Sequence, residues 1–373
     1  MTTAEAAQSA QLFQPCTLRS VTLRNRIVIS PMCQYSCANG VATDWHLVHL
    51  GSRAVGGAGL IITEATAVEA RGRISPEDLG LWEDTQIAPL ARITAFLREH
   101  GAAPGIQLAH AGRKASTYRP WSGAGAVPVA EGGWDDVIAP SAVAFSDTYA
   151  QPREMTRDDL AAVKEAFVAA TRRALTAGFE FIEIHAAHGY LLHTFLSPLS
   201  NTRTDEYGGD INGRMRFPLE VVAAIRAAWP AGLPLGIRLS ATDWVPGGWT
   251  GDDSVILAKG LQARGIDVIT ASSGGVSTQQ QIPLGPGYQV HLAEQIRREV
   301  AIPTMTVGLI TEPEQAEAIL AAGQADLIAL ARELLRSPYW PLQAAATLGV
   351  DLDWPAQYGR SKPAPAVPVA ARG

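Results

Sequence analysis

Short apolar runs recur along the chain, and amphipathic stretches of helical length separate them. The run at 60–65 is typical, because it follows a glycine-rich turn at 56–59 and is followed by a helical pattern from 85 to 100. Runs of nearly continuous apolar character predict strands of a parallel sheet that is buried on both faces. Eight of them are found, at 26–30, 60–65, 105–108, 179–184, 235–239, 267–270, 303–307 and 326–330.

Eight alternating strand–helix units predict an α/β fold, a single (β/α)8 TIM barrel. A six-stranded doubly wound sheet is the competing arrangement. It is disfavoured because no strand is followed by the Gly-x-Gly-x-x-Gly turn of dinucleotide-binding sheets, and the glycines at 56–59 precede a strand instead. The length of 373 residues fits one large barrel or two average domains, so the periodicity decides between them.

The pattern divides the chain into four regions. Residues 1–11 are a polar leader, 12–345 form the barrel, 346–362 are a C-terminal segment, and 363–373 are a Pro/Ala-rich tail expected to be disordered. Two long insertions, 115–153 and 197–214, follow the third and fourth strands. We expect both on the rim at the C-terminal ends of the strands, and the first to carry a small hairpin.

Composition narrows the class of protein. A hydrophobic content of 47% with 18% charged residues indicates an ordinary globular protein with ample core. The net charge of −6 argues against nucleic acid or an anionic membrane as a partner. No apolar run reaches the ~18 residues that cross a bilayer, and no signal peptide is evident. Three cysteines, Cys16, Cys33 and Cys37, fit a reducing compartment, so we expect a cytoplasmic protein.

One stretch concentrates chemistry at the end of the fourth predicted strand. His185, His188 and Tyr190 lie within six residues, and Gly189 allows a sharp turn between them. Imidazole N–H groups beside a phenol O–H can bind a carbonyl oxygen and supply a proton. Each residue alone is readily explained by packing, but the three together indicate a catalytic site.

In a barrel, the residues just beyond each strand face one shared pocket. Those of the first, second, third and fifth strands are Ser30, Pro31, Met32, Cys33, Tyr35, Ala65, Gln107 and Arg238. The last two strands are followed by Gly308, Ala331 and Arg332, where barrels often bind phosphate. An amide, a buried cation and a phosphate site are what flavin mononucleotide (FMN) requires. The alternative for Arg238 is a salt bridge to a barrel carboxylate such as Glu183.

These motifs resemble those of the Old Yellow Enzyme family of flavin-dependent ene-reductases. The resemblance is carried by 185–191 with its continuation through 195–209, and by 30–35 and 107–113. It covers about 12–360. The pair of histidines and the cysteine at position 33 are similar to the bacterial subgroup of xenobiotic reductases and thermophilic-like NADPH dehydrogenases. Ala331 departs from the pattern, since glycine is expected before Arg332.

The resemblance implies a function and a role for each site residue. The barrel, 12–345, would bind FMN tightly and non-covalently, with NADPH as hydride donor and NADH as the alternative. Hydride would pass through flavin N5 in two half-reactions to enones, maleimides or nitroalkenes. His185 and His188 would bind the carbonyl oxygen, Tyr190 would donate the proton, and Tyr35 would be a second donor. Cys33 would tune the flavin.

The C-terminal segment completes this hypothesis. Residues 357–360 resemble the stretch that, in this subgroup, carries an arginine into a neighbouring subunit, so Arg360 would bind substrate there in a homodimer or homotetramer. The alternative is a solvated chain end.

Three rival functions remain open. The first is an iron–sulfur enoate reductase, which three cysteines do not favour, and the second is a metal-dependent hydrolase, for which no third ligand stands out. The third is a non-catalytic binding barrel. We expect no metal site.

Overall fold

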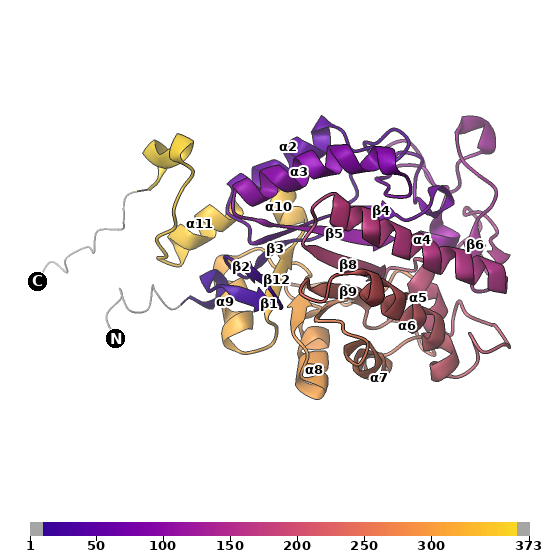
Figure 1. Cartoon of the computed structure of the whole chain (residues 1–373). Coiled ribbons are helices and arrows are strands. Elements are labelled where there is room, and N and C mark those ends of the chain that lie inside the picture. The colour runs from indigo at the N-terminus through magenta and orange to yellow at the C-terminus, as the bar shows by residue number, and fades with distance from the viewer. Residues whose placement is uncertain (1–9, 364–373) are drawn as a thin grey trace, which may run out of the picture.

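The computed structural model describes residues 10–363, so most of the predicted leader and tail lie outside the described residues. Eight parallel strands close into a barrel in the order β10-β11-β12-β3-β4-β5-β8-β9 (Figure 1). The closed sheet confirms the predicted (β/α)8 barrel and contradicts the doubly wound alternative. The barrel strands are β3 (Ile27–Ile29), β4 (Leu60–Ala67), β5 (Ala103–Ala109), β8 (Phe181–Ala186), β9 (Leu235–Ser240), β10 (Val268–Ser272), β11 (Thr304–Thr306) and β12 (Leu327–Leu330).

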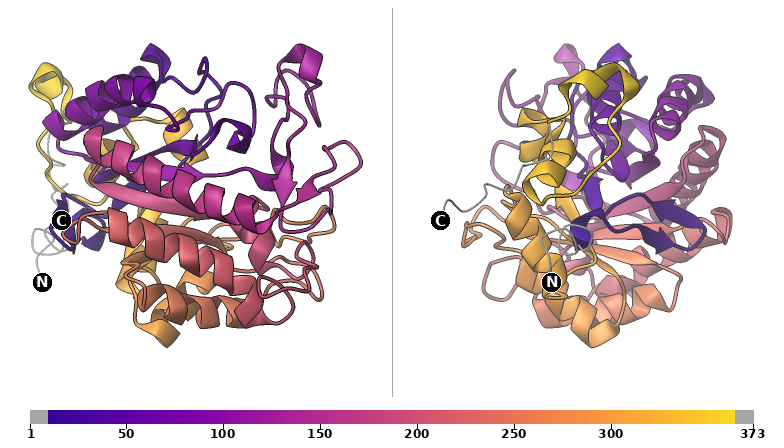
Figure 2. Two further views of the ribbon diagram at one scale, coloured as in Figure 1. Left: turned by 45° about the vertical axis from the view of Figure 1, so that its right-hand side comes forward. Right: turned by 90° about the vertical axis from the view of Figure 1, so that its left-hand side faces the viewer.

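Helices form an outer layer around these strands (Figure 2). They are α2 (Asp44–Val55), α3 (Ile87–Glu99), α4 (Arg157–Thr176), α5 (Leu191–Leu196), α6 (Ile211–Ala228), α7 (Gly251–Gln262), α8 (Val290–Val300), α9 (Pro313–Ala321), α10 (Arg332–Arg336) and α11 (Trp340–Thr347). Helix α4 shows why they form: Thr156 and Asp159 make a capping box, and residues such as Phe167 turn an apolar face to the barrel. Within residues 10–363, no helix has the length and apolarity to span a bilayer.

The N-terminal end of the barrel is closed by an element that the apolar pattern did not predict. Strands β1 (Cys16–Leu18) and β2 (Val21–Leu23) form an antiparallel hairpin. Its apolar side chains join the cluster inside the barrel, which includes Leu60 and Phe181. Three-residue strands are too short to show a clear alternation, so sequence periodicity misses them.

The insertion 115–153 leaves the opposite, C-terminal end of the barrel. Its named strands, β6 (Ile138–Ala139) and β7 (Arg153–Glu154), pair in parallel, and the predicted small hairpin corresponds to an isolated antiparallel bridge between Thr117 and Ala126. Both views show this insertion at one end of the barrel and the short helix η6 (Ala356–Ser361) at the other (Figures 1 and 2). The C-terminal segment therefore lies far from the rim of its own chain.

Strand register brings the predicted site residues to common levels. A register shift in β4 between Ile62 and Ala65 pairs Ala65 with Gln107, and Gln107 in turn pairs with Glu183. The strand continues to Ala67, two residues beyond its predicted end. Across the next strands, Arg238 is paired with His185 on one side and with Thr270 on the other.

Candidate active site

The three residues singled out at the end of β8 come together in the fold. His185 belongs to β8, the chain then turns at His188 (φ +60°) and Gly189 (φ +76°), and Tyr190 caps helix α5. The ring of His185 lies 5.2 Å from that of His188 and 5.0 Å from that of Tyr190, measured between centroids, and is nearly perpendicular to both. Rings at this spacing can act on one small molecule.

A buried pair of residues supports this turn from beneath. The backbone N–H of Gly189 donates to Nδ1 of His193 at 2.8 Å, and Nε2 of His193 donates to Oδ1 of Asp243 at 2.9 Å. Both side chains are fully buried. The sequence analysis missed this pair, because nothing in the motif distinguishes a supporting histidine from a core residue.

The protonation states suit His185 as a donor and Tyr190 as an acid. Nδ1 of His185 accepts from the backbone N–H of Ala187 at 3.2 Å, so the proton of the neutral ring is on Nε2. Burial, helped by the charge of Arg238, lowers the pKa of His185 well below its usual value. Burial raises the pKa of Tyr190 well above its usual value. At neutral pH, His185 therefore presents N–H and Tyr190 presents O–H.

Lys114 is a further cation at this turn, and the sequence analysis did not select it. Its ammonium donates to the carbonyl oxygen of His188 at 2.8 Å and to that of Gly275, and it lies 3.9 Å from the ring centroid of Phe145. Burial, together with the charge of Arg113, lowers the pKa of Lys114 to about 7. The prediction considered only the residues just beyond each strand, and Lys114 lies five residues after the end of β5.

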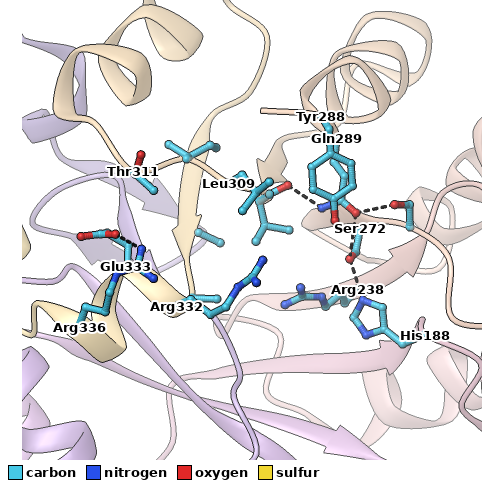
Figure 3. Close-up of a pocket in the computed structure, with 16 residues that line it drawn as sticks. His188, Arg238, Ser272, Tyr288, Gln289, Leu309, Thr311, Arg332, Glu333 and Arg336 are labelled. Carbon is cyan, nitrogen blue, oxygen red and sulfur yellow. Dashed lines mark hydrogen bonds and ion pairs between the residues drawn. The ribbon is translucent and has the colours of Figure 1, made fainter. Parts of the chain in front are cut away.

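A cavity of about 320 Å³ opens beside His188, within the range of cofactor pockets (Figure 3). Five predicted site residues line it, namely His188, Arg238, Gly308, Ala331 and Arg332. The unpredicted lining residues include Ser272, Ser273, Tyr288 and Gln289. The strand-end rule, applied to β10, would have found both serines. Tyr288 and Gln289 precede helix α8 and carried no such signal.

Arg238 provides the test of whether the residues fit an anionic cofactor. Its Nη1 donates to Oγ of Ser30 at 2.7 Å, while its Nε is buried without a hydrogen-bond partner in the described part of the chain. The alternative salt bridge is not formed. The carboxylate of Glu183 instead accepts from Gln107 at 2.7 Å and from Thr270 at 2.5 Å, and no ion pair joins it to Arg238 among residues 10–363.

Arg332 reaches into the same space from the other side (Figure 3). Two guanidinium groups around one polar cavity, one of them with an unpaired N–H, fit a phosphate-bearing group such as FMN. Gly308 has φ +131°, and a Cβ there would lie 2.9 Å from Nε2 of Gln289, so glycine is required. Ala331 lines the same cavity with φ −112°, outside the left-handed region that favours glycine.

The remaining predicted residues lie beside Tyr190 or far from the site. Ala65, Cys33, Tyr35 and Tyr190 belong to one apolar cluster, and the Cys33 thiol is hydrogen-bonded to Tyr35. Pro31 and Met32 lead from β3 towards Cys33. Arg360 is exposed on η6, at the opposite end of the barrel. No group of three or more His, Cys, Asp and Glu side chains within 10–363 is arranged to hold a metal ion.

Comparison with known families agrees with this geometry. The model of the NADH:flavin oxidoreductase / NADH oxidase family matches residues 11–350. The chain belongs to that family. The predicted Old Yellow Enzyme resemblance, the enzyme class and the dependence on FMN and a nicotinamide are thereby confirmed.

Individual known proteins are similar to this chain over most of its length. The NADPH dehydrogenase of Geobacillus thermodenitrificans is 50% identical over 351 residues, which are 94% of this chain and 98% of that protein. Morphinone reductase superposes with a TM-score of 0.76 at 28% identity over 92% of this chain and 91% of its own. A 2-naphthoyl-CoA reductase gives a TM-score of 0.83 at 26% identity over 90% of this chain, which spans 52% of that longer chain.

Proposed function

We propose that the protein is an NADPH-dependent ene-reductase that reduces the activated C=C bond of α,β-unsaturated carbonyl compounds. The observation that carries the proposal is the group of His185, His188 and Tyr190. The His185 ring lies 5.2 Å from that of His188 and 5.0 Å from that of Tyr190, and His188 lines the polar cavity. The names of its relatives, NADPH dehydrogenase and morphinone reductase, support the donor and the class of acceptor.

The histidines would bind the oxygen of the acceptor. Negative charge develops on that oxygen when the β-carbon gains hydride, so N–H donors that already point to it stabilise the transition state. The N–H of His185 is fixed by the backbone of Ala187 and needs no reorganisation. Removal of one such donor costs ~10²-fold or more in rate in other enzymes.

Tyr190 would donate the proton to the α-carbon. A phenol with a raised pKa keeps its proton until an enolate forms beside it, and the tyrosinate then recovers a proton from solvent. Tyr35, whose pKa is also raised by burial, would be the second donor to the acceptor oxygen.

A set of residues around the cavity and along the barrel rim would hold FMN. They are Ser30, Pro31, Met32, Cys33, Ala65, Gln107, His185, Arg238, Gly308, Ala331 and Arg332. Arg238 and Arg332 would neutralise the anionic charge of the cofactor. Bound FMN supplies hydride transfer between nicotinamide and acceptor.

Arg360 would act on a neighbouring subunit. The segment η6 lies at the end of the barrel opposite the insertion 115–153, so Arg360 does not serve the site of its own chain (Figure 1). Its exposure leaves the guanidinium free to enter a second copy, in a homodimer or homotetramer.

Transient kinetics on the purified flavoprotein test the proposal. Under anaerobic conditions, NADPH should bleach the flavin, with NADH as the slower donor, and cyclohexenone, a maleimide or a nitroalkene should then restore its colour. Reduction by NADPH without reoxidation by any of the three acceptors would remove the ene-reductase assignment and leave only the family.

A further inference from the structure

The ring of His188 has one hydrogen-bond partner among the described residues, the hydroxyl of Ser272. Nε2 of His188 and Oγ of Ser272 are 2.7 Å apart (Figure 3). Ser272 is the last residue of β10, is buried, and is fixed by pairing with Ser240. A buried hydroxyl on a paired barrel strand therefore contacts a ring whose proton position matters for catalysis.

The acceptors within reach of the Ser272 hydroxyl indicate which of the two atoms carries the proton. The Ser272 hydroxyl can donate to Nε2 of His188 at 2.7 Å or to Oε1 of Gln289 at 3.5 Å, the outer limit of a hydrogen bond. Oε1 of Gln289 already accepts from the hydroxyl of Ser273 at 2.6 Å. The 2.7 Å contact can form in either direction, but the buried hydroxyl of Ser272 has a close acceptor for its own proton only if it donates to His188. The arrangement that satisfies this hydroxyl therefore has Ser272 as the donor and Nε2 as the acceptor.

A neutral imidazole has a single proton, which must then be on Nδ1. Burial, followed by the charge of Arg238, lowers the pKa of His188 well below its usual value, so the ring is neutral at neutral pH. His185 is fixed in the opposite tautomer by the backbone N–H of Ala187. The two rings thus each retain one N–H that no described residue occupies.

We infer that Ser272 is a positioning residue, which fixes the Nδ1–H tautomer of His188 and so provides the acceptor oxygen with its second N–H donor. The inference rests on the proposed function for the identity of that oxygen. In the other tautomer a nitrogen lone pair would face the oxygen, which removes one donor and adds repulsion. The backbone of His188 cannot compensate, because its N–H donates to Ser240 at 2.8 Å and its carbonyl accepts from Lys114.

The tautomer can be measured directly, without substrate, by nitrogen NMR of the holoenzyme with isotope-labelled histidines. The signals of His188 are assigned with a His188→Asn variant. The wild type should show the proton on Nδ1, and Ser272→Ala should shift His188 towards a mixture or to the Nε2–H form. Ser272→Thr, which keeps the hydroxyl, should behave as the wild type.

Ser273→Ala is the matched control, because that hydroxyl bonds to Gln289 and not to His188. It should leave the tautomer unchanged. A wild-type His188 with its proton on Nε2, or an unchanged Nδ1–H form in Ser272→Ala, would overturn the inference. The flavin absorbance of each variant reports whether the fold and cofactor are retained.

A second readout separates this inference from the proposed function. Phenolates imitate the enolate, so Ser272→Ala should bind para-substituted phenols about tenfold more weakly, whereas Ser273→Ala should bind them normally. If the tautomer shifts in Ser272→Ala but neither phenols nor enones interact with the wild type, the tautomer assignment stands and the ene-reductase function falls. If phenols bind the wild type and Ser272→Ala equally, the positioning role is wrong and the function is untouched.

Discussion

The ammonium of Lys114 donates to the carbonyl oxygen of His188 at 2.8 Å. It also donates to the carbonyl of Gly275, so one cation joins the turn after β8 to the loop after β10. His188 has a positive φ, which a non-glycine residue adopts only when its surroundings impose it. Lys114 is one of the groups that impose it.

Replacement of Lys114 by Met should change the pH dependence of stability. The native pKa is about 7, below the ~10.4 of an unfolded lysine, so between these values the unfolded state binds more protons. The unfolding free energy of the wild type, relative to Lys114→Met, should therefore rise with pH from about 7 to about 10. Denaturant titrations at several pH values measure this difference.

Lys164→Met is the control for that series, because Lys164 makes only a half-exposed pair with Glu220 at 3.4 Å. The rise with pH for Lys114→Met should exceed any rise for Lys164→Met over the same range. Equal slopes for the two variants would show that Lys114 is not held with a depressed pKa.

Tyr190→Phe should slow only one half-reaction. Reduction of the flavin by NADPH needs no proton from the phenol, so its rate should be unchanged, while reoxidation by cyclohexenone should fall by ~10²-fold or more. Nitroalkenes should be less affected, since a nitronate can be protonated in solution. Stopped-flow absorbance resolves the two steps, and equal slowing of both would indicate a structural role.

Gly189→Ala should destabilise the fold through a backbone collision. Gly189 has φ +76°, and a Cβ there would lie 2.2 Å from the carbonyl oxygen of Gly275. Gly209 has a similar φ of +71° with nothing within 4 Å of its Cβ position, so Gly209→Ala isolates the cost of φ alone. We expect about 1 kcal/mol for Gly209→Ala and at least twice that for Gly189→Ala, from chemical unfolding curves. Equal losses would contradict the collision.

Arg360→Ala tests the shared site. If Arg360 binds substrate in a neighbouring subunit, the variant should keep its flavin and show a raised apparent KM for enones. In dimers reassembled from Arg360→Ala and Tyr190→Phe chains, one site has both native residues, so activity should approach half that of the wild type. Activity equal to the mean of the two parents would show that each chain uses its own arginine or none.

The apolar periodicity was sufficient to predict the barrel, because every barrel strand is buried on both faces and helices separate the strands along the chain. Residues that follow strands were predictable by position, as His185 and Arg238 show. Supporting groups were not: Asp243 reaches His193 from a loop some 50 residues away. Gln289, at the start of α8, lines the cavity, and no local sequence pattern predicts that it contacts residues from other strands.

The main-chain contact between Gly189 and Gly275 has a consequence for how this enzyme can diversify. The backbone position of Tyr190 is set by the close approach of these two loops, which Lys114 joins and His193 supports. Trp121, an exposed side chain that contacts Tyr35, takes no part in this contact between the loops, so its exchange should leave Tyr190 in place. Outer residues of this kind can therefore vary independently of the turn that carries Tyr190.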